Sequence, residues 1–339
     1  MTQNLTRLSQ APHWSFRNGG NTPTARQYWV RRSQYTPNGP RISAVMAGAA
    51  PGELRKIHEA GNQALTVMAP DKHAWYTIHD WNPHAAWDPV SQSLYLGGKR
   101  LMYKLIRYDD VLGDWIHMPM PLPLARTGGT GHWYGMTAPM GNGKVMLKDH
   151  VYDSADGSFD LVVEPFNTVS AVGTWTDCGD VAMRVTSNYA RILNKASGAI
   201  ASVIGHGHGG HPIAMYHPQH DRVLVVGGTD TSRRASLLTK AAVQAVVADV
   251  PEDISMSTGS WAVAHPAGCW LVKGQGPGEH LYAAWPSAAL DAVTWQDLGV
   301  SFDAALTYPT AALDAERNLL LIVASQGLYG WQLPNLTAP

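Results

Sequence analysis

The sequence of 339 residues has few cysteines, few phenylalanines and few charged side chains. Its two cysteines, Cys178 and Cys269, are too few for a disulfide framework and match no zinc-binding spacing. Charged residues make up 15% of the chain and the formal net charge is −1, which excludes a basic nucleic-acid binder and an acidic solvating tail for the chain as a whole. Phenylalanine occurs four times, against 13 tryptophans and 13 tyrosines. The latter two predominate where a ring is buried at one end and meets a polar partner at the other.

Long apolar runs are also missing. The longest, at 319–324, has the length of a strand and is far too short to span a membrane. The opening sequence, MTQNLTRLSQAPHW, contains no apolar segment of the signal-peptide type. We therefore expect a protein that is made in the cytoplasm, does not insert into a membrane and could be incorporated into a virion.

Turn-forming residues are abundant, with 33 glycines and 22 prolines. This composition favours many short strands over long helices. Only 51–61 and 237–249 have a helical pattern, and both lie between the repeats described next, so we expect two short helices there.

A pattern of strand, turn and strand recurs along the chain. The clear copies are at 85–98, 214–228, 262–276 and 311–324, and weaker copies are at 34–48 and 135–147. The corresponding turn residues are Thr36, Asp88, Ala138, His217, His265 and Asp314. Their spacing is close to the ~40–50 residues of a four-stranded propeller blade. We read His217 and His265 as turn residues that hydrogen-bond the backbone, because Asp88 and Asp314 occupy the same place.

One interval, from Ala138 to His217, is much longer than the others and contains a further hairpin candidate at 189–205. Either 189–205 or 214–228 opens the fourth unit. The pattern predicts an all-β, closed propeller of six four-stranded blades, with seven as the alternative.

Residues 94–115 resemble a kelch repeat, as also found in the galactose-oxidase type of propeller. The resemblance rests on Gly97-Gly98 after a strand, followed by Tyr108 and, seven residues later, Trp115. Gly227-Gly228 repeats the double glycine without the tyrosine and tryptophan. In such a fold the tyrosine and tryptophan fill the space between neighbouring sheets.

The last unit is one strand short, because only 326–333 follows the hairpin at 311–324. A propeller does not leave such an edge open. We expect residues 8–17 to supply the outer strand, which divides the chain into an N-terminal segment, 1–26, and a propeller, 27–339, with an insertion around 229–258.

Histidines in a glycine-rich segment are the candidate metal ligands. His206 and His208 alternate in the segment 205–211, so both would point to one face of an extended chain. The segment offers no carboxylate or cysteine to complete a site, and the alternative is a loop in which these histidines pack or meet solvent. No other cofactor is indicated.

A second set of side chains is predicted to line a pocket where the blades converge. Histidine and arginine beside aromatic rings form sugar-binding platforms and can serve acid–base chemistry. The alternative is packing between blades. The set comprises His84, Arg126, His132, Trp133, Tyr134, Tyr189, Arg191 and His211.

No complete catalytic motif is recognised, which favours a non-catalytic interaction module, such as a structural or adaptor component of a phage virion or tail. The alternative is a polysaccharide lyase, a glycoside hydrolase or a glycan-binding propeller that uses the pocket. We expect a protein partner or a second copy to contact the faces and the insertion at 229–258. We expect no nucleic-acid partner.

Overall fold

The computed structural model describes strands and turns distributed along the whole chain. The described residues are 5–6, 30–31, 50, 54–59, 84–88, 90, 93–97, 105–109, 114–118, 137–147, 150–161, 174–185, 189–205, 207–208, 212–228, 233–254, 260–274, 280–301, 310–315, 318–324 and 327–339. Their regular secondary structure is β-strand, and they contain no helix long and apolar enough to cross a membrane.

Within these residues the strands form six four-stranded antiparallel sheets and one two-stranded ladder. The first sheet contains β4 (His84–Asp88), β5 (Ser93–Gly97), β6 (Leu105–Asp109) and β7 (Asp114–Met118). The second contains β8 (Thr137–Gly141), β9 (Lys144–Leu147), β10 (His150–Asp153) and β11 (Phe159–Leu161). The third contains β12 (Thr174–Asp177), β13 (Val181–Val185), β14 (Tyr189–Asn194) and β15 (Ile200–Ile204).

The next sheets continue in chain order. The fourth contains β16 (Ile213–His217), β17 (Arg222–Val226), β18 (Ala235–Leu238) and β19 (Gln244–Val247). The fifth contains β20 (Trp261–His265), β21 (Cys269–Lys273), β22 (His280–Pro286) and β23 (Val293–Ser301). The sixth contains β24 (Thr310–Asp314), β25 (Leu319–Ala324), β26 (Gly327–Gln332) and, from far earlier in the chain, β3 (Leu54–Glu59).

An N-terminal strand does complete the sheet of the last three strands, but it is β3 and not residues 8–17. β26 pairs with β25 on one side and with β3 on the other, so its outer edge is occupied. Residues 8–17 lie outside the described part of the chain. Earlier in the chain, β1 (Leu5–Thr6) pairs with β2 (Val30–Arg31).

Both predicted helices are wrong. Residues 54–59 within the first one form β3, because β26 offers a hydrogen-bonding edge that overrides local helix propensity. The second one spans the end of β18, a turn and β19. The turn places Ala242 at φ 56°, which breaks any helical continuation. The segment 229–258 is therefore no simple insertion, since it supplies the two outer strands of the fourth sheet.

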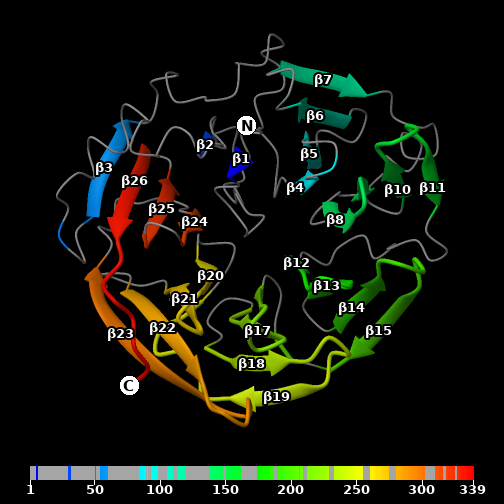
Figure 1. The fold of residues 1–339 in the computed structure, drawn as a ribbon. Coiled ribbons are helices and arrows are strands. Elements are labelled where there is room, and N and C mark those ends of the chain that lie inside the picture. The colour runs from blue at the N-terminus through cyan, green and yellow to red at the C-terminus, as the bar shows by residue number, and fades with distance from the viewer. Residues whose placement is uncertain are drawn as a thin grey trace, which may run out of the picture.

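The sheets are arranged around a common centre, with each first strand on the inside (Figure 1). From β4 to β24, the first strands of successive sheets are neighbours. Apolar clusters lie between adjacent sheets; for example, Val263 and Trp261 of the fifth sheet pack with Ile322 and Trp331 of the sixth. Burial of apolar area between the sheets is therefore what holds each one against the next.

The structure settles which hairpin opens the fourth sheet. β16 and β17 do so, and 189–205 forms the last two strands of the sheet before. The sequence analysis did not recognise the unit that begins at β12, in which Asp177 is the turn residue. It escaped notice because β12 is short and carries no apolar run. The weak copy at 34–48 lies outside the described residues.

The aromatic positions partly follow the kelch-like expectation. Tyr108 on β6 and Trp115 on β7 are backbone partners in the register of these two strands. Trp295 on β23 donates its indole N–H to the carbonyl oxygen of Ala248 at 2.9 Å. Trp270 donates to the carbonyl oxygen of Met215 on the neighbouring sheet, also at 2.9 Å. These two tryptophans bridge the fourth and fifth sheets.

Candidate functional site

The residues predicted to line a pocket are only partly placed by the structure. His84 is the first residue of β4, and Tyr189 and Arg191 lie on β14. The others fall outside the described residues: Arg126, His132, Trp133, Tyr134 and His211. The pocket as a whole stays a prediction.

Tyr189 and Arg191 form a compact pair. They are two residues apart on one strand and therefore face the same side of the sheet. The guanidinium carbon of Arg191 lies 5.1 Å from the centroid of the Tyr189 ring, within cation–π distance. Both side chains are half-buried.

Arg184 is a third member of this group that the sequence reading missed. It pairs in register with Arg191 across β13 and β14, and only 1% of it is exposed. Burial lowers the pKa of the Arg184 guanidinium, the charge of Arg191 lowers it further, and Tyr189 opposes the shift. One signal was available in the sequence: Arg184 is the single charged residue in the apolar strand 181–185.

His208 is buried and held by two neighbours. Its Nδ1 lies 2.8 Å from the carbonyl oxygen of Gly227, and its Nε2 lies 2.9 Å from the hydroxyl of Ser236. A metal ion would have to displace one of these partners. His206 is outside the described residues, and in the described part no three histidine, cysteine, aspartate or glutamate side chains are arranged to hold a metal.

The two turn histidines behave as predicted. Nδ1 of His217 accepts a hydrogen bond from the backbone N–H of Gln219 at 3.3 Å, and Nδ1 of His265 accepts one from Ala267 at 3.1 Å. Their role as turn residues is confirmed.

Neither cysteine is set up as a nucleophile. Cys178 and Cys269 are fully buried, and burial raises the pKa of each thiol to about 12. The reactive form of cysteine is the thiolate, which these surroundings disfavour.

An acid–base cluster joins the segment after β19 to the fifth sheet. Nδ1 of His280 lies 2.8 Å from a carboxylate oxygen of Asp297, and this bond raises the pKa of His280. Glu252 accepts a hydrogen bond from the Tyr282 hydroxyl at 2.9 Å and one from the backbone N–H of His280 at 3.4 Å. Burial, with help from Glu252, raises the pKa of Tyr282. The cluster fixes residues 250–254 on the next sheet.

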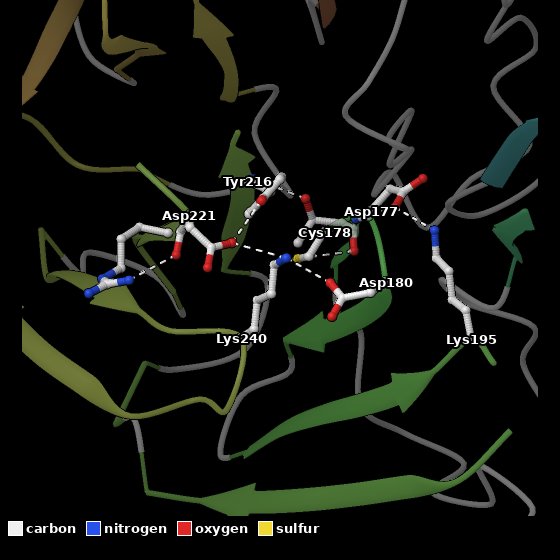
Figure 2. A network of polar contacts seen from close by, with 10 residues as sticks. Asp177, Cys178, Asp180, Lys195, Tyr216, Asp221 and Lys240 are labelled. Carbon is white, nitrogen blue, oxygen red and sulfur yellow. Dashed lines mark hydrogen bonds and ion pairs between the residues drawn. The ribbon is translucent and has the colours of Figure 1, made fainter. Parts of the chain in front are cut away.

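A second polar network links turns of the third and fourth sheets (Figure 2). The ammonium group of Lys240 lies 2.7 Å from Asp180 and 3.1 Å from Asp221. Asp221 also accepts a hydrogen bond from the Tyr216 hydroxyl at 2.8 Å. Lys195 separately pairs with Asp177 at 2.5 Å. The lysines neutralise these carboxylates, and the network therefore holds the turns together. The sequence analysis did not predict this network.

Exposed apolar side chains are few in the described part of the chain. The large ones are Val90, at 64% exposure, Val243, at 66%, and Val246, at 58%. Val243 and Val246 lie at the turn before β19 and on β19 itself, inside the segment predicted to contact a partner. β19 is the outermost strand of its sheet.

No protein-family model matches the sequence, and no curated protein does either. Solved structures match. U3-55K has a TM-score of 0.53 at 6% identity, covering 74% of this chain and 80% of that one. YjhT has a TM-score of 0.45 at 10% identity, covering 64% and 84%. The extracellular domain of the hybrid two-component system BT4673 from B. thetaiotaomicron has a TM-score of 0.49 at 14% identity, covering 75% of this chain and 32% of that one.

This chain is similar to β-propeller proteins. U3-55K is of the WD40 type and YjhT of the kelch type. At 6% identity the likeness to U3-55K concerns the fold alone, and a shared fold does not imply a shared function. The four-stranded sheets of this chain are like propeller blades.

Proposed function

We propose that this chain is a six-bladed β-propeller, closed by β3, that serves as a non-catalytic interaction module. The six four-stranded sheets and the neighbouring first strands support this architecture. The pairing of β26 with β3 supports closure, because a strand from the start of the chain completes the sheet at its end.

The observation that carries the interaction role is the exposure of Val243 and Val246. Val243, in the turn before β19, and Val246, on β19, are both exposed at the outer edge of the fourth sheet. We propose that a protein partner or a second copy covers this edge, in a larger assembly such as a virion or tail.

The state of the polar groups favours binding over catalysis. The buried thiols are held in the protonated form, and His208 has both ring nitrogens at hydrogen-bond distance from protein groups. The ammonium group of Lys240 is paired with the carboxylate of Asp180.

Sedimentation velocity over a wide concentration range tests the interaction role. We expect the wild type to self-associate and the double variant Val243→Lys, Val246→Lys to remain monomeric with an unchanged circular dichroism spectrum. Val90→Lys is the matched control, because Val90 is similarly exposed but lies in the turn between β4 and β5 of the first sheet. A wild type that is monomeric throughout contradicts association between copies, and association unchanged in the double variant places the contact elsewhere.

The second candidate is a glycan-binding or glycan-cleaving propeller. It is favoured by the stacked Tyr189 and Arg191 beside Arg184, because arginine and tyrosine together suit an acidic sugar. Titration calorimetry with uronic-acid oligosaccharides tests it. Binding that is lost in Arg191→Gln, or product release from those oligosaccharides, would favour this candidate over the first.

A further inference from the structure

Two buried histidines occupy the same position in consecutive sheets. His217 ends β16 and His265 ends β20, with exposures of 1% and 7%. Each imidazole reaches across to the turn of the following sheet. Nε2 of His217 lies 3.0 Å from the backbone carbonyl oxygen of His265, and Nε2 of His265 lies 3.0 Å from Oδ1 of Asn318.

The surrounding groups fix the tautomer of both rings. A backbone N–H, from Gln219 or Ala267, points at each Nδ1, so each Nδ1 must carry a lone pair. Each Nε2 must therefore carry the proton and donate it to the next sheet. Asn318 agrees with this assignment, because its Nδ2 donates to the carbonyl oxygens of Leu333 and Pro334 and leaves Oδ1 as an acceptor.

We propose that His217 and His265 form an acid-sensitive link between the fourth, fifth and sixth sheets. Protonation of either imidazole puts a proton on Nδ1, directly against a backbone N–H. Two donors then face each other in a buried site, and the turn hydrogen bond is lost. The device needs no ligand and is independent of the interaction role proposed above.

Among the described neighbours, only uncharged groups favour a positive charge on the two rings: the backbone of His265 and Cys269 for His217, and the side chain of Asn318 for His265. The titratable groups facing His217 are His220, whose ring centroid lies 4.6 Å away, and His265; the edge of Trp270 packs beside it. Cys269 lies opposite His265 in the register of β20 and β21. Among described neighbours, no carboxylate acts on either ring.

Burial accordingly lowers the pKa of His217 and of His265 from 6.5. His280 shows the opposite behaviour, because Asp297 accepts its proton and raises its pKa. For His217 and His265 the stabilising contribution is complete above the unfolded value of 6.5 and is lost as the pH falls through the lower folded values. The sensitive window therefore lies below 6.5.

Hydrogen exchange of the wild-type protein gives the first test. We expect the amides of Gln219 and Ala267 to lose protection between about pH 7.5 and about pH 5, after correction for intrinsic exchange. The Gly179 amide is the internal control, since it occupies the same turn position but donates to the carboxylate of Asp177 at 2.9 Å. Equal pH dependence at all three amides would overturn the proposal.

The second test uses the variant His217→Asn, His265→Asn, which retains an acceptor for each turn amide and removes the titrating rings. Over the same pH range the wild type should lose at least about 2 °C more in Tm than the variant. His280→Asn is the matched control and should leave the acid loss of the wild type in place. An undiminished acid loss in the double variant would refute the link. If the double variant does not fold, the exchange comparison decides alone.

Discussion

Lys240 on the turn after β18 places its ammonium group 2.7 Å from the carboxylate of Asp180, which lies on the turn between β12 and β13 of the neighbouring sheet. The same ammonium group reaches Asp221 and lies 5.6 Å from the centroid of the Tyr216 ring. One side chain thus connects three turns from two sheets. Its hydrogen bond lowers the pKa of Asp180 and contributes to the lowered pKa of Asp221.

Replacing Lys240 should loosen this junction. We expect Lys240→Met to lower Tm by roughly 1–3 °C at low salt, because exposed ion pairs contribute little singly but more within a network. The difference from wild type should shrink at high salt, where charges are screened. Lys195→Met, which breaks a single pair with Asp177, is the control and should lower Tm less. A larger effect from Lys195 would contradict the network.

Breaking the pairing of β3 should be far more damaging than trimming the chain before it. Of the neighbouring residues Arg55 and Lys56, one directs its N–H toward β26 because successive groups alternate along a strand. We expect Arg55→Pro with Lys56→Pro to expose the edge of β26 and to give aggregated protein in size-exclusion chromatography. Deletion of residues 1–20 is the comparison and should leave this sheet paired. A soluble proline variant with wild-type Tm would contradict the closing role proposed for β3.

Gly227 cannot accept a side chain. A Cβ atom there would lie 2.1 Å from the carbonyl oxygen of Ile254, and φ is 72°. We expect Gly227→Ala to reduce the free energy of unfolding by about 3 kcal/mol or more in urea titration. Gly141→Ala has a similar φ of 81° with open space around the Cβ position, and should lose only about 1 kcal/mol. Similar losses in both variants would show that strain alone, without the clash, matters.

Neither thiol should react with a thiol reagent while the protein is folded. With the pKa of each raised to about 12 by burial, Cys178 and Cys269 should not react with a disulfide reagent at neutral pH. After unfolding in guanidinium, two thiols per chain should react with the reagent. Reaction of one thiol in the folded protein would identify an exposed, reactive cysteine and would reopen the question of catalysis.

The regular spacing of apolar hairpins predicted the first, fourth, fifth and sixth sheets, because β5, β17, β21 and β25 each contain a recognisable apolar strand. It failed where the strands depended on distant partners. β3 has the sequence LRKIHE, which is compatible with a helix, and becomes a strand only beside β26. β12 has the sequence TWTD, which identifies no strand by itself.

The polar sites were less predictable than the fold. The role of His217 and His265 could be inferred, since equivalent turns carry aspartate. The contacts of Lys240 with Asp180, or of His280 with Asp297, could not, because they join turns and strands whose proximity is set by the packing of the sheets. Arg184 could have been noticed in the sequence as a charged residue in an apolar strand. Its pairing with Arg191, however, could be known only from the register of β13 and β14.

The pairing of β3 with β26 also has a consequence for how the chain is made. At roughly 5–20 residues per second, residues 54–59 leave the ribosome roughly 15 to 50 s before residues 327–332. The other four-stranded sheets use consecutive strands and can form in order during translation. β3, in contrast, has no strand to pair with until β26 has been synthesised. A chain that stops before β26 never provides the partner, so interrupted products keep an exposed strand that chaperones and proteases can recognise.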